Sequence, residues 1–358
     1  MEKIKIGIIG NGWRTMNYVQ IIEHLNEVFE IKGMLLRNDK KAKDLSNRFP
    51  TFTNKEAFFQ LDVDFIFCLL PKGIMVEWCQ EIFERNIPVL IETSPGKTME
   101  DLHAMWELKE KYNARIQVAE QYFLQPYHST LISVANSGLL GDITDCTIGA
   151  MHGYHGTSVM RKLLGIGYEN FKVSGKEFHF PVTYTHGRAG ASQDGDIVQD
   201  CTKKAVFEFE NGKVGFFDFG SEKYFNRIRD LQMSLRGVRG EVFNTTIHYL
   251  NEDNLPISQE MNRVDAGTFG NLEGYFHIGF TFQGNYVYKN PFEKYKARLS
   301  DDEIAMAGML VGMAEYVKTG KEFYSLQEAL QDTYLMLLME ESIEKGTVVQ
   351  STTMPWAK

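Results

Sequence analysis

A glycine-rich turn follows the first apolar run of the chain. Ile4–Ile9 leads into Gly10-Asn11-Gly12-Trp13-Arg14-Thr15, and a helical pattern begins at about residue 15. At a strand–helix junction, the first glycine permits a tight turn, and the second lets the backbone approach a pyrophosphate at the helix N-terminus. Thr15 stands at the third position of the G-x-G-x-x-G pattern, where glycine or alanine is usual. The turn predicts a dinucleotide site; the alternative is a turn that binds no ligand.

The residues after the second apolar run bear on the choice of cofactor. A carboxylate about 20 residues beyond the glycines would bond the ribose 2′-hydroxyl of NAD. That position is Leu36 here, and the next residue, Arg37, could pair with the 2′-phosphate of NADP. The alternative is that Arg37, Lys40 and Lys41 form a solvated, basic helix start. We therefore expect NADP to be favoured, with NAD possible.

Two histidines lie three residues apart near the middle of the chain. His155 begins a predicted helix after a strand, and an imidazole, whose ordinary pKa is about 6.5, suits proton exchange with an alcohol or carbonyl at neutral pH. The alternative is a histidine that satisfies a helix N-terminus. His152 and His155 could also hold a metal, but no third ligand with suitable spacing follows, so we expect no metal.

The strands that must position the glycine turn begin at regular intervals, close to the span of a βαβ unit, which is about 30 residues. Apolar runs alternate with helical patterns, which predicts a parallel sheet covered on both faces. We expect an α/β, doubly wound dinucleotide-binding domain over residues 1–120. Its strands are Ile4–Gly10, Glu30–Leu36, Phe65–Leu70, Val89–Glu92 and Ile116–Ala119, with helices near 15–25, 39–48, 73–85 and 98–111.

Beyond Ala119 the pattern changes to a helix, a strand and a helix (about 124–137, 143–150 and 153–164), and then to strands and turns over 172–290. Asn211-Gly212 predicts a two-residue hairpin turn. A second antiparallel pair is expected at 227–236 and 241–249, and a long loop at 251–275. The polar, glycine-rich segment 184–200 could cap a polyol site or be a surface loop. With helices near 301–319 and 325–344, residues 121–358 are expected to form a mostly antiparallel α+β domain for substrate binding and oligomerisation.

Composition limits the classes of protein that the chain can belong to. Its 358 residues are 43% hydrophobic and 24% charged, which excludes collagen-like, coiled-coil and largely disordered chains. The formal charge is −9 without a basic run, so we expect no nucleic-acid or membrane partner. We also expect no signal peptide. The four cysteines form no C-x-x-C pair, which indicates a reducing, cytoplasmic location.

Further motifs follow one another in a specific order along nearly the whole chain, and with them the sequence resembles the glucose–fructose oxidoreductase / inositol dehydrogenase (Gfo/Idh/MocA) family. They are Gly10-x-Gly12, Pro71, Glu92-x-x-Pro95, Gly138-Leu-Leu-Gly141-Asp-Ile, Gly153-x-His155, Phe209-Glu-Asn-Gly212, Leu235-Arg-Gly-x-x-Gly240 and Glu341-Ser342-x-x-x-Gly346.

The resemblance implies a Rossmann domain and a second domain whose large, open, mainly antiparallel sheet often packs against another subunit. It also implies an oxidoreductase that transfers a hydride between a nicotinamide cofactor and a sugar-like or cyclic polyol or carbonyl substrate. His155 corresponds to the family histidine that points at the nicotinamide and the substrate. The cofactor-binding residues expected are Gly10, Asn11, Gly12, Trp13, Arg14, Arg37, Leu70, Pro71, Glu92, Thr93, Pro95 and Gln121.

The sequence departs from the family where the chemistry is expected. The family's Glu-Lys-Pro reads Glu92-Thr93-Ser94-Pro95, so Thr93 or Ser94 replaces the lysine. Lys97 is the nearest lysine that could supply the missing charge, and Tyr154 could donate a hydrogen bond to a substrate oxygen. We expect a cis Ser94–Pro95 bond beside the nicotinamide pocket. Met151, Ser158 and Phe123 stand where the family has two aspartates and an arginine.

Two functions stay open at this point. The first is an NAD(P)-dependent oxidoreductase with a small-molecule substrate, assembled as a homodimer or homotetramer through the second-domain sheet. The second is a cofactor-binding sensor or assembly protein with little redox activity, because the family lysine is absent.

Overall fold

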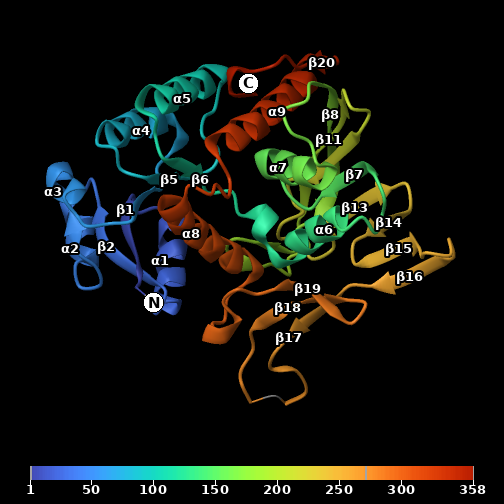
Figure 1. The fold of residues 1–358 in the computed structure, drawn as a ribbon, viewed down its shortest axis with the longest axis horizontal. Helices are drawn as coiled ribbons and strands as arrows, with labels where there is room; N and C mark the ends of the chain where they lie inside the picture. Colours follow the sequence, from blue (N-terminus) through green and yellow to red (C-terminus); the bar gives the residue numbers. More distant parts are fainter. Residues whose placement is uncertain (1, 271, 358) are drawn as a thin grey trace. The chain divides into compact units, whose positions relative to one another are not determined.

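The apolar runs in the first third of the chain form strands of one parallel sheet in the computed structural model, which describes residues 2–270 and 272–357 (Figure 1). The strands are β1 (Ile4–Ile9), β2 (Phe29–Leu35), β3 (Thr51–Phe52), β4 (Phe65–Cys68), β5 (Val89–Ile91) and β6 (Ile116–Val118). The helices between them are α1 (Trp13–His24), α2 (Asp39–Leu45), α3 (Lys55–Phe59), α4 (Met75–Glu84) and α5 (Met99–Tyr112), with 3-10 turns at Lys72–Ile74 and Tyr122–Leu124.

The strand order is β3-β2-β1-β4-β5-β6, so the prediction of a doubly wound parallel sheet is confirmed. The sequence did not predict β3 or α3, because each is too short to show a period. The order reverses between β1 and β4. In such sheets the connections leave opposite faces at that point and open a crevice at the carboxyl ends of the strands.

The core of this sheet is completed by a helix from the far end of the chain. Ile6 and Ile8 of β1 are fully buried, and they share one apolar cluster with α1 and with α8 (Asp301–Thr319). Ser300 and Glu303 form a capping box, which explains why α8 begins there. Its buried residues Met309 and Leu310 belong to the same cluster. The apolar cluster of the first sheet is therefore formed jointly by its strands, α1 and α8.

The second large sheet has nine strands in the order β16-β15-β14-β13-β7-β12-β11-β8-β20. Its strands are β7 (Ile143–Gly149), β8 (Phe171–Thr183), β11 (Ile197–Phe209), β12 (Val214–Gly220), β13 (Gln232–Gly237), β14 (Gly240–Phe243), β15 (Thr246–Leu250), β16 (Pro256–Glu260) and β20 (Val349–Gln350). Only the β7–β12 pair is parallel, which confirms the predicted mainly antiparallel sheet. The accompanying helices are α6 (Pro126–Asn136), α7 (Gly153–Leu164) and α9 (Leu326–Lys345).

Two local predictions in this region are corrected. The β11–β12 hairpin has a three-residue loop, because Phe209 N–H donates to Lys213 O at 3.0 Å and Gly212 takes the left-handed φ of 83°. The expected loop at 251–275 contains β16 and β17 (Asn262–Asp265), whose polar residues hide the strand pattern; residue 271 lies outside the described residues.

The remaining elements are small. Within the polar segment 184–200, β9 (His186–Gly187) and β10 (Gly190–Ala191) form a two-stranded ribbon, and β11 begins before the segment ends. A three-stranded sheet joins β17, β18 (His277–Phe282) and β19 (Asn285–Lys289). Further 3-10 turns lie at Thr268–Gly270, Glu293–Tyr295 and Pro355–Ala357.

The chain divides into two compact units whose boundaries cross the sequence several times. The first contains Met1–Pro126, Asp265–Ile278 and Lys289–Leu330, and the second contains Tyr127–Val264, Gly279–Tyr288 and Gln331–Lys358. The first unit takes in late segments because α8 completes its core. A domain boundary near residue 120 stays a prediction. Over the described residues, no helix is both long and apolar enough to cross a membrane.

Candidate functional site

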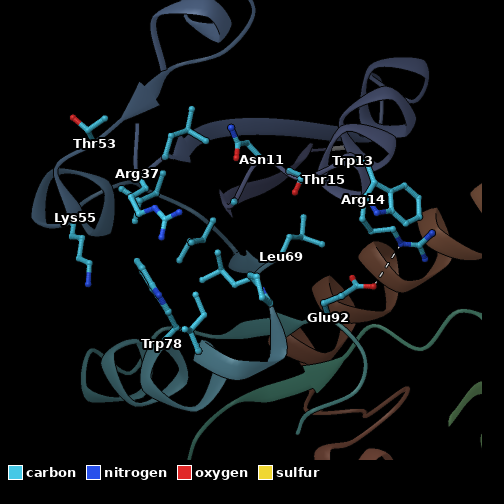
Figure 2. A pocket seen from close by; sticks show the side chains of 18 residues that line it. Asn11, Trp13, Arg14, Thr15, Arg37, Thr53, Lys55, Leu69, Trp78 and Glu92 are labelled. Atoms are coloured by element: carbon cyan, nitrogen blue, oxygen red, sulfur yellow. Dashed lines mark ion pairs between the residues drawn. The ribbon is translucent and has the colours of Figure 1, made fainter. Parts of the chain in front are cut away.

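A pocket of about 630 Å³ opens at the carboxyl ends of β1, β2 and β4, within the first unit. Figure 2 shows the side chains that surround it. This volume is typical of small-molecule sites. The wall includes many of the predicted cofactor residues, namely Gly10, Asn11, Gly12, Trp13, Arg14, Arg37, Leu70, Pro71 and Glu92.

The glycine turn has the geometry that an anion at a helix N-terminus needs. Gly10 has φ +116°, and a Cβ there would lie 2.5 Å from the carbonyl oxygen of Leu69, so no other residue fits without strain. A Cβ on Gly12, by contrast, would meet nothing within 4 Å, which leaves open space in front of the helix. Gly12 is the N-cap of α1, whose first turn carries no acidic residue. The turn therefore fits a pyrophosphate.

The two glycines give different expected results when each is replaced by alanine. Gly10→Ala should lower the free energy of unfolding by about 1–3 kcal/mol, because its backbone conformation is strained for any side chain. Gly12→Ala should change the stability by less than about 1 kcal/mol, yet weaken dinucleotide binding at least tenfold, because its methyl group enters the open space. Urea denaturation and fluorescence titration measure the two effects. Wild-type affinity in Gly12→Ala would show that the pyrophosphate does not lie there.

Thr15, the unusual third residue of the motif, lies in the pocket wall and is 1% exposed. Its hydroxyl oxygen finds no hydrogen-bond partner within the described residues. The close helix–strand contact that a glycine normally permits here is therefore made with a buried threonine instead.

One end of the pocket is formed by Arg37, Thr53, Lys55 and Trp78 (Figure 2). Arg37 follows β2 and precedes Asn38, the N-cap of α2. Asn38 Oδ1 accepts from the backbone N–H groups of Lys40 and Lys41, so the helix start is capped without Arg37.

Lys55, at the start of α3, was not predicted from the sequence. Its ammonium lies 4.2 Å from the ring centre of Trp78, on α4, and its Nζ lies 2.6 Å from Glu81 Oε2. Neither Lys55 nor Trp78 belongs to a motif, so only the folded chain brings them to the pocket.

Arg14 and Glu92 lie at the other end of the pocket and form an ion pair, with Arg14 Nε 3.6 Å from Glu92 Oε1 (Figure 2). Arg14 Nη1 also contacts Asp302 Oδ2 at 3.2 Å. Burial opposes the charge of Arg14, but Tyr18, Glu92 and Asp302 raise the pKa of its guanidinium above the usual value. Arg14 is therefore a fixed cation that holds Glu92 in place.

Three other predicted cofactor residues lie near this end but are not part of the pocket wall. Gln121 is buried, and in the amide orientation that satisfies both atoms its oxygen accepts from Arg14 Nη2 at 2.7 Å. Thr93 is half-buried, and Pro95 is buried. Thr93–Ser94 is the cis peptide bond of the described chain, so the expectation of a cis Ser94–Pro95 bond is wrong. Ser94 Oγ donates to Gly96 O at 2.8 Å and closes this turn.

Two lysines lie within electrostatic range of each other near Glu92. Lys97 is exposed, and its backbone N–H donates to Asp101 Oδ2 at 2.8 Å. Lys72, which directly follows Pro71, was not singled out in the sequence. Burial lowers the pKa of Lys72, Glu92 opposes that change, and Lys97 adds to it. Both lysines are candidates for the charge that the missing family lysine would supply.

The predicted histidines gather with aromatic residues in the second unit. His155 is half-buried in the first turn of α7, 4.9 Å between ring centres from His152, the N-cap residue. Tyr154 is 4% exposed, and its ring centre lies 5.6 Å from that of His155. His152 Nδ1 lies 2.5 Å from the hydroxyl of Tyr224, which the sequence analysis missed because it follows β12 in a loop.

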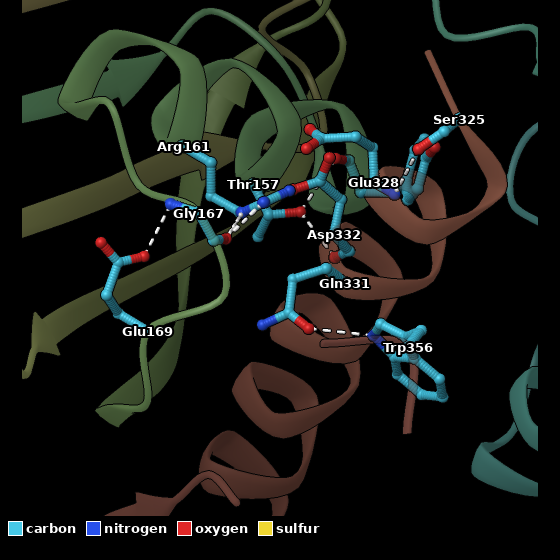
Figure 3. Close-up of polar contacts among 10 residues, drawn as sticks. Thr157, Arg161, Gly167, Glu169, Ser325, Glu328, Gln331, Asp332 and Trp356 are labelled. Atoms are coloured by element: carbon cyan, nitrogen blue, oxygen red, sulfur yellow. Dashed lines mark hydrogen bonds and ion pairs between the residues drawn. The ribbon is translucent and has the colours of Figure 1, made fainter. Parts of the chain in front are cut away.

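A buried polar network holds α7, the helix that carries His155 (Figure 3). Arg161 Nη1 donates to Asp332 Oδ1 of α9 at 2.9 Å, and both side chains are 1% exposed. Thr157 Oγ1 donates to Asp332 O at 2.8 Å, and Arg161 Nε donates to Gly167 O at 3.0 Å. Thr157 and Arg161 lie one helical turn apart on α7, and both bind Asp332, so the network holds α7 against α9.

The architecture and the pocket together define a dinucleotide-binding α/β protein. Residues 4–120 match the family described as an oxidoreductase family with an NAD-binding Rossmann fold, the Gfo/Idh/MocA family. The resemblance read from the sequence is thus confirmed over residues 4–120, the part of the chain that matches this family. No curated protein matches the sequence significantly.

Solved structures share the fold at low sequence identity. An oxidoreductase from Agrobacterium radiobacter, solved with NAD+, L-tartaric acid and magnesium, has 14% identity and a TM-score of 0.69, over 97% of this chain and 98% of its own. A scyllo-inositol dehydrogenase from Lactobacillus casei has 16% identity and a TM-score of 0.64, over 98% of both chains. A putative NADPH-dependent oxidoreductase from Desulfitobacterium hafniense has 9% identity and a TM-score of 0.68, over 97% of both.

Proposed function

We propose that the protein is an NADP-preferring oxidoreductase that transfers a hydride between the nicotinamide and a sugar-like or cyclic polyol or carbonyl substrate. The observation that carries this proposal is the pocket at the reversal of strand order, with the Gly10–Arg14 turn in its wall. The family of the first domain supports it. We also propose a cytoplasmic protein that forms a homodimer or homotetramer through the nine-stranded sheet, on which Phe180 is 46% exposed and stacks on Phe178.

The preference for NADP rests on the charges at the Arg37 end of the pocket. Arg37 and Lys55 both line it, and the side chain at position 36 is a buried leucine rather than a carboxylate. A 2′-phosphate would gain charge-assisted hydrogen bonds from Arg37 and Lys55. Trp78 offers a flat apolar surface of the kind on which an adenine ring packs.

Arg37→Ser is expected to weaken NADPH binding at least tenfold, a difference of about 1.4 kcal/mol, and to leave NADH binding unchanged. The reason is that only NADPH carries the phosphate with which Arg37 would pair. Trp13 and Trp78 both line the pocket, so their fluorescence can follow the titrations. Lys40→Ser, on the exposed surface of α2, is the matched control and should change neither affinity. An unchanged ratio of the two affinities in Arg37→Ser would contradict the proposal.

The proposed chemistry assigns distinct roles to residues of this chain. The nicotinamide, when bound, supplies the site that accepts or gives the hydride. The Gly10–Gly12 turn holds the pyrophosphate, and the Arg14–Glu92 pair shapes the other end of the pocket. His155 takes the hydroxyl proton of the substrate during oxidation and returns it during reduction. Lys72 or Lys97 supplies positive charge beside Glu92, and Tyr154 donates to a substrate oxygen.

The deciding experiment is a titration with NADPH and NADH, followed by turnover assays on polyols, sugars, ketoses and imines. Micromolar binding of NADPH with turnover on one of these classes is the expected result. Tight binding without any turnover would favour the sensor or assembly protein instead. Absence of binding by either nucleotide would overturn the proposed function.

A further inference from the structure

Three side chains of types that can bind a metal ion meet on the paired strands β8 and β11 of the second unit. Glu177 and His179 lie on β8, and Cys201 lies on β11. One ligand atom from each lies within 4.8 Å of the other two. His179 Nε2 is 3.1 Å from Glu177 Oε1. In the part of the chain that the structure describes, this is the one group of three such side chains close enough to share an ion.

Strand pairing explains how residues so far apart in sequence come together. Glu177 and His179 are two residues apart on one strand, so their side chains lie on the same face of the sheet. Cys201 is the direct partner of His179 in the antiparallel register, and side chains of directly opposed residues point to the same face. The pairing of β8 with β11 runs without a register shift, so the three positions are fixed by the backbone.

The surroundings hold this group in place without covering it. The backbone of Cys201 is held by Ser221, which directly follows β12: the Cys201 N–H donates to Ser221 Oγ at 3.1 Å, and the Cys201 carbonyl accepts from the Ser221 N–H at 3.0 Å. Lys203, the register partner of Glu177, directs its ammonium to Glu340 Oε1 at 2.7 Å. His179 has a 60% exposed side chain, so an ion can enter from solvent.

We propose that Glu177, His179 and Cys201 bind a zinc ion, with water in the fourth position. Thiolate, imidazole and carboxylate are the ligand types that Zn²⁺ takes in proteins, and three protein ligands with one open position form a known arrangement. In a tetrahedral zinc site, the ligand atoms lie about 3.3–3.6 Å apart, so side-chain movements of about 1 Å complete the site. Binding releases the thiol proton of Cys201 to solvent. The ion would clamp β8 to β11 beside the polar segment 184–200.

The test is a titration of the full chain with Co²⁺, after treatment with a chelator and in the presence of a phosphine reductant. Wild-type protein should take up one ion and develop the near-ultraviolet absorption of a sulfur–cobalt bond, and Zn²⁺ should displace the cobalt. Cys201→Ser should abolish the absorption, and His179→Ala and Glu177→Gln should each weaken binding at least tenfold. Circular dichroism checks that each variant is folded.

Two control variants remove the same side-chain types elsewhere. His24 is an exposed residue of α1 and Glu208 is an exposed residue of β11, so the variants His24→Ala and Glu208→Gln should both bind the metal as wild type does. Three results would overturn the site: no uptake of either metal, uptake that is indifferent to the three substitutions and therefore adventitious, or loss in Cys201→Ser alone. The affinity for NADPH should be the same in all variants, because none of the substituted side chains lines the pocket.

Discussion

Replacing Asp332 with alanine is expected to lower the free energy of unfolding by about 3–5 kcal/mol. The side chain is fully buried and accepts a hydrogen bond from Arg161 Nη1 at 2.9 Å. Its removal leaves the Arg161 guanidinium in the interior with its charge uncompensated. In the wild type, attraction to Asp332 offsets the cost of removing that charge from water, and the variant loses this compensation. Urea denaturation followed by circular dichroism gives the change from the midpoint and the slope of the transition.

Two further variants separate the loss of charge balance from a general sensitivity of α9. Glu340→Ala removes an ion pair with Lys203 from the same helix, but that pair is 31% and 40% exposed, so its loss should cost less than about 1 kcal/mol. The double variant Arg161→Met, Asp332→Leu removes both charges and should be more stable than Asp332→Ala. If Asp332→Ala were no less stable than Glu340→Ala, the buried pair would not hold α7.

Replacing His155 with alanine is expected to reduce kcat by about 10²- to 10⁴-fold, the usual contribution of a positioned acid–base group. The affinity for NADPH should stay the same, because His155 is not among the residues that line the cofactor pocket. Steady-state turnover on the substrate found by the screen and a separate NADPH titration measure the two quantities. Unchanged turnover would show that another group exchanges the proton.

His152→Ala is the matched control for this prediction. His152 is exposed and its ring contacts both His155 and the Tyr224 hydroxyl, so its loss should affect the position of His155 rather than remove the acid–base group. The expected decrease in kcat is smaller than for His155→Ala. If His152→Ala had the larger effect, the roles of the two histidines would have to be exchanged.

The sequence predicted the parts of the site that depend on local pattern. The apolar run at Ile4–Ile9 and the glycines after it specify a strand, a tight turn and a helix start within a few residues of one another. Gly10 is required by its positive φ, and that requirement is a property of the local backbone. Local pattern was also sufficient to predict α7 and α8 with the bounds that the structure has.

Local pattern was not sufficient to predict pocket residues that lie on short segments or on the surface of a helix, nor the exact length of a turn. Lys55 follows a two-residue strand with no period to recognise, and Trp78 lies on the surface of a predicted helix. Asn211-Gly212 indicated a turn correctly, but its length was decided by the hydrogen bond between Phe209 and Lys213.

The sequence by itself therefore determined the class of fold, the dinucleotide turn and the helix that presents His155. The tertiary structure decided which distant residues meet: Arg161 with Asp332, 171 positions later, and His179 with Cys201 across two strands. The physical reason is that periodicity and turn residues act over a few residues. The register of a sheet and the return of α8 to the first core are set by which apolar faces can be buried together.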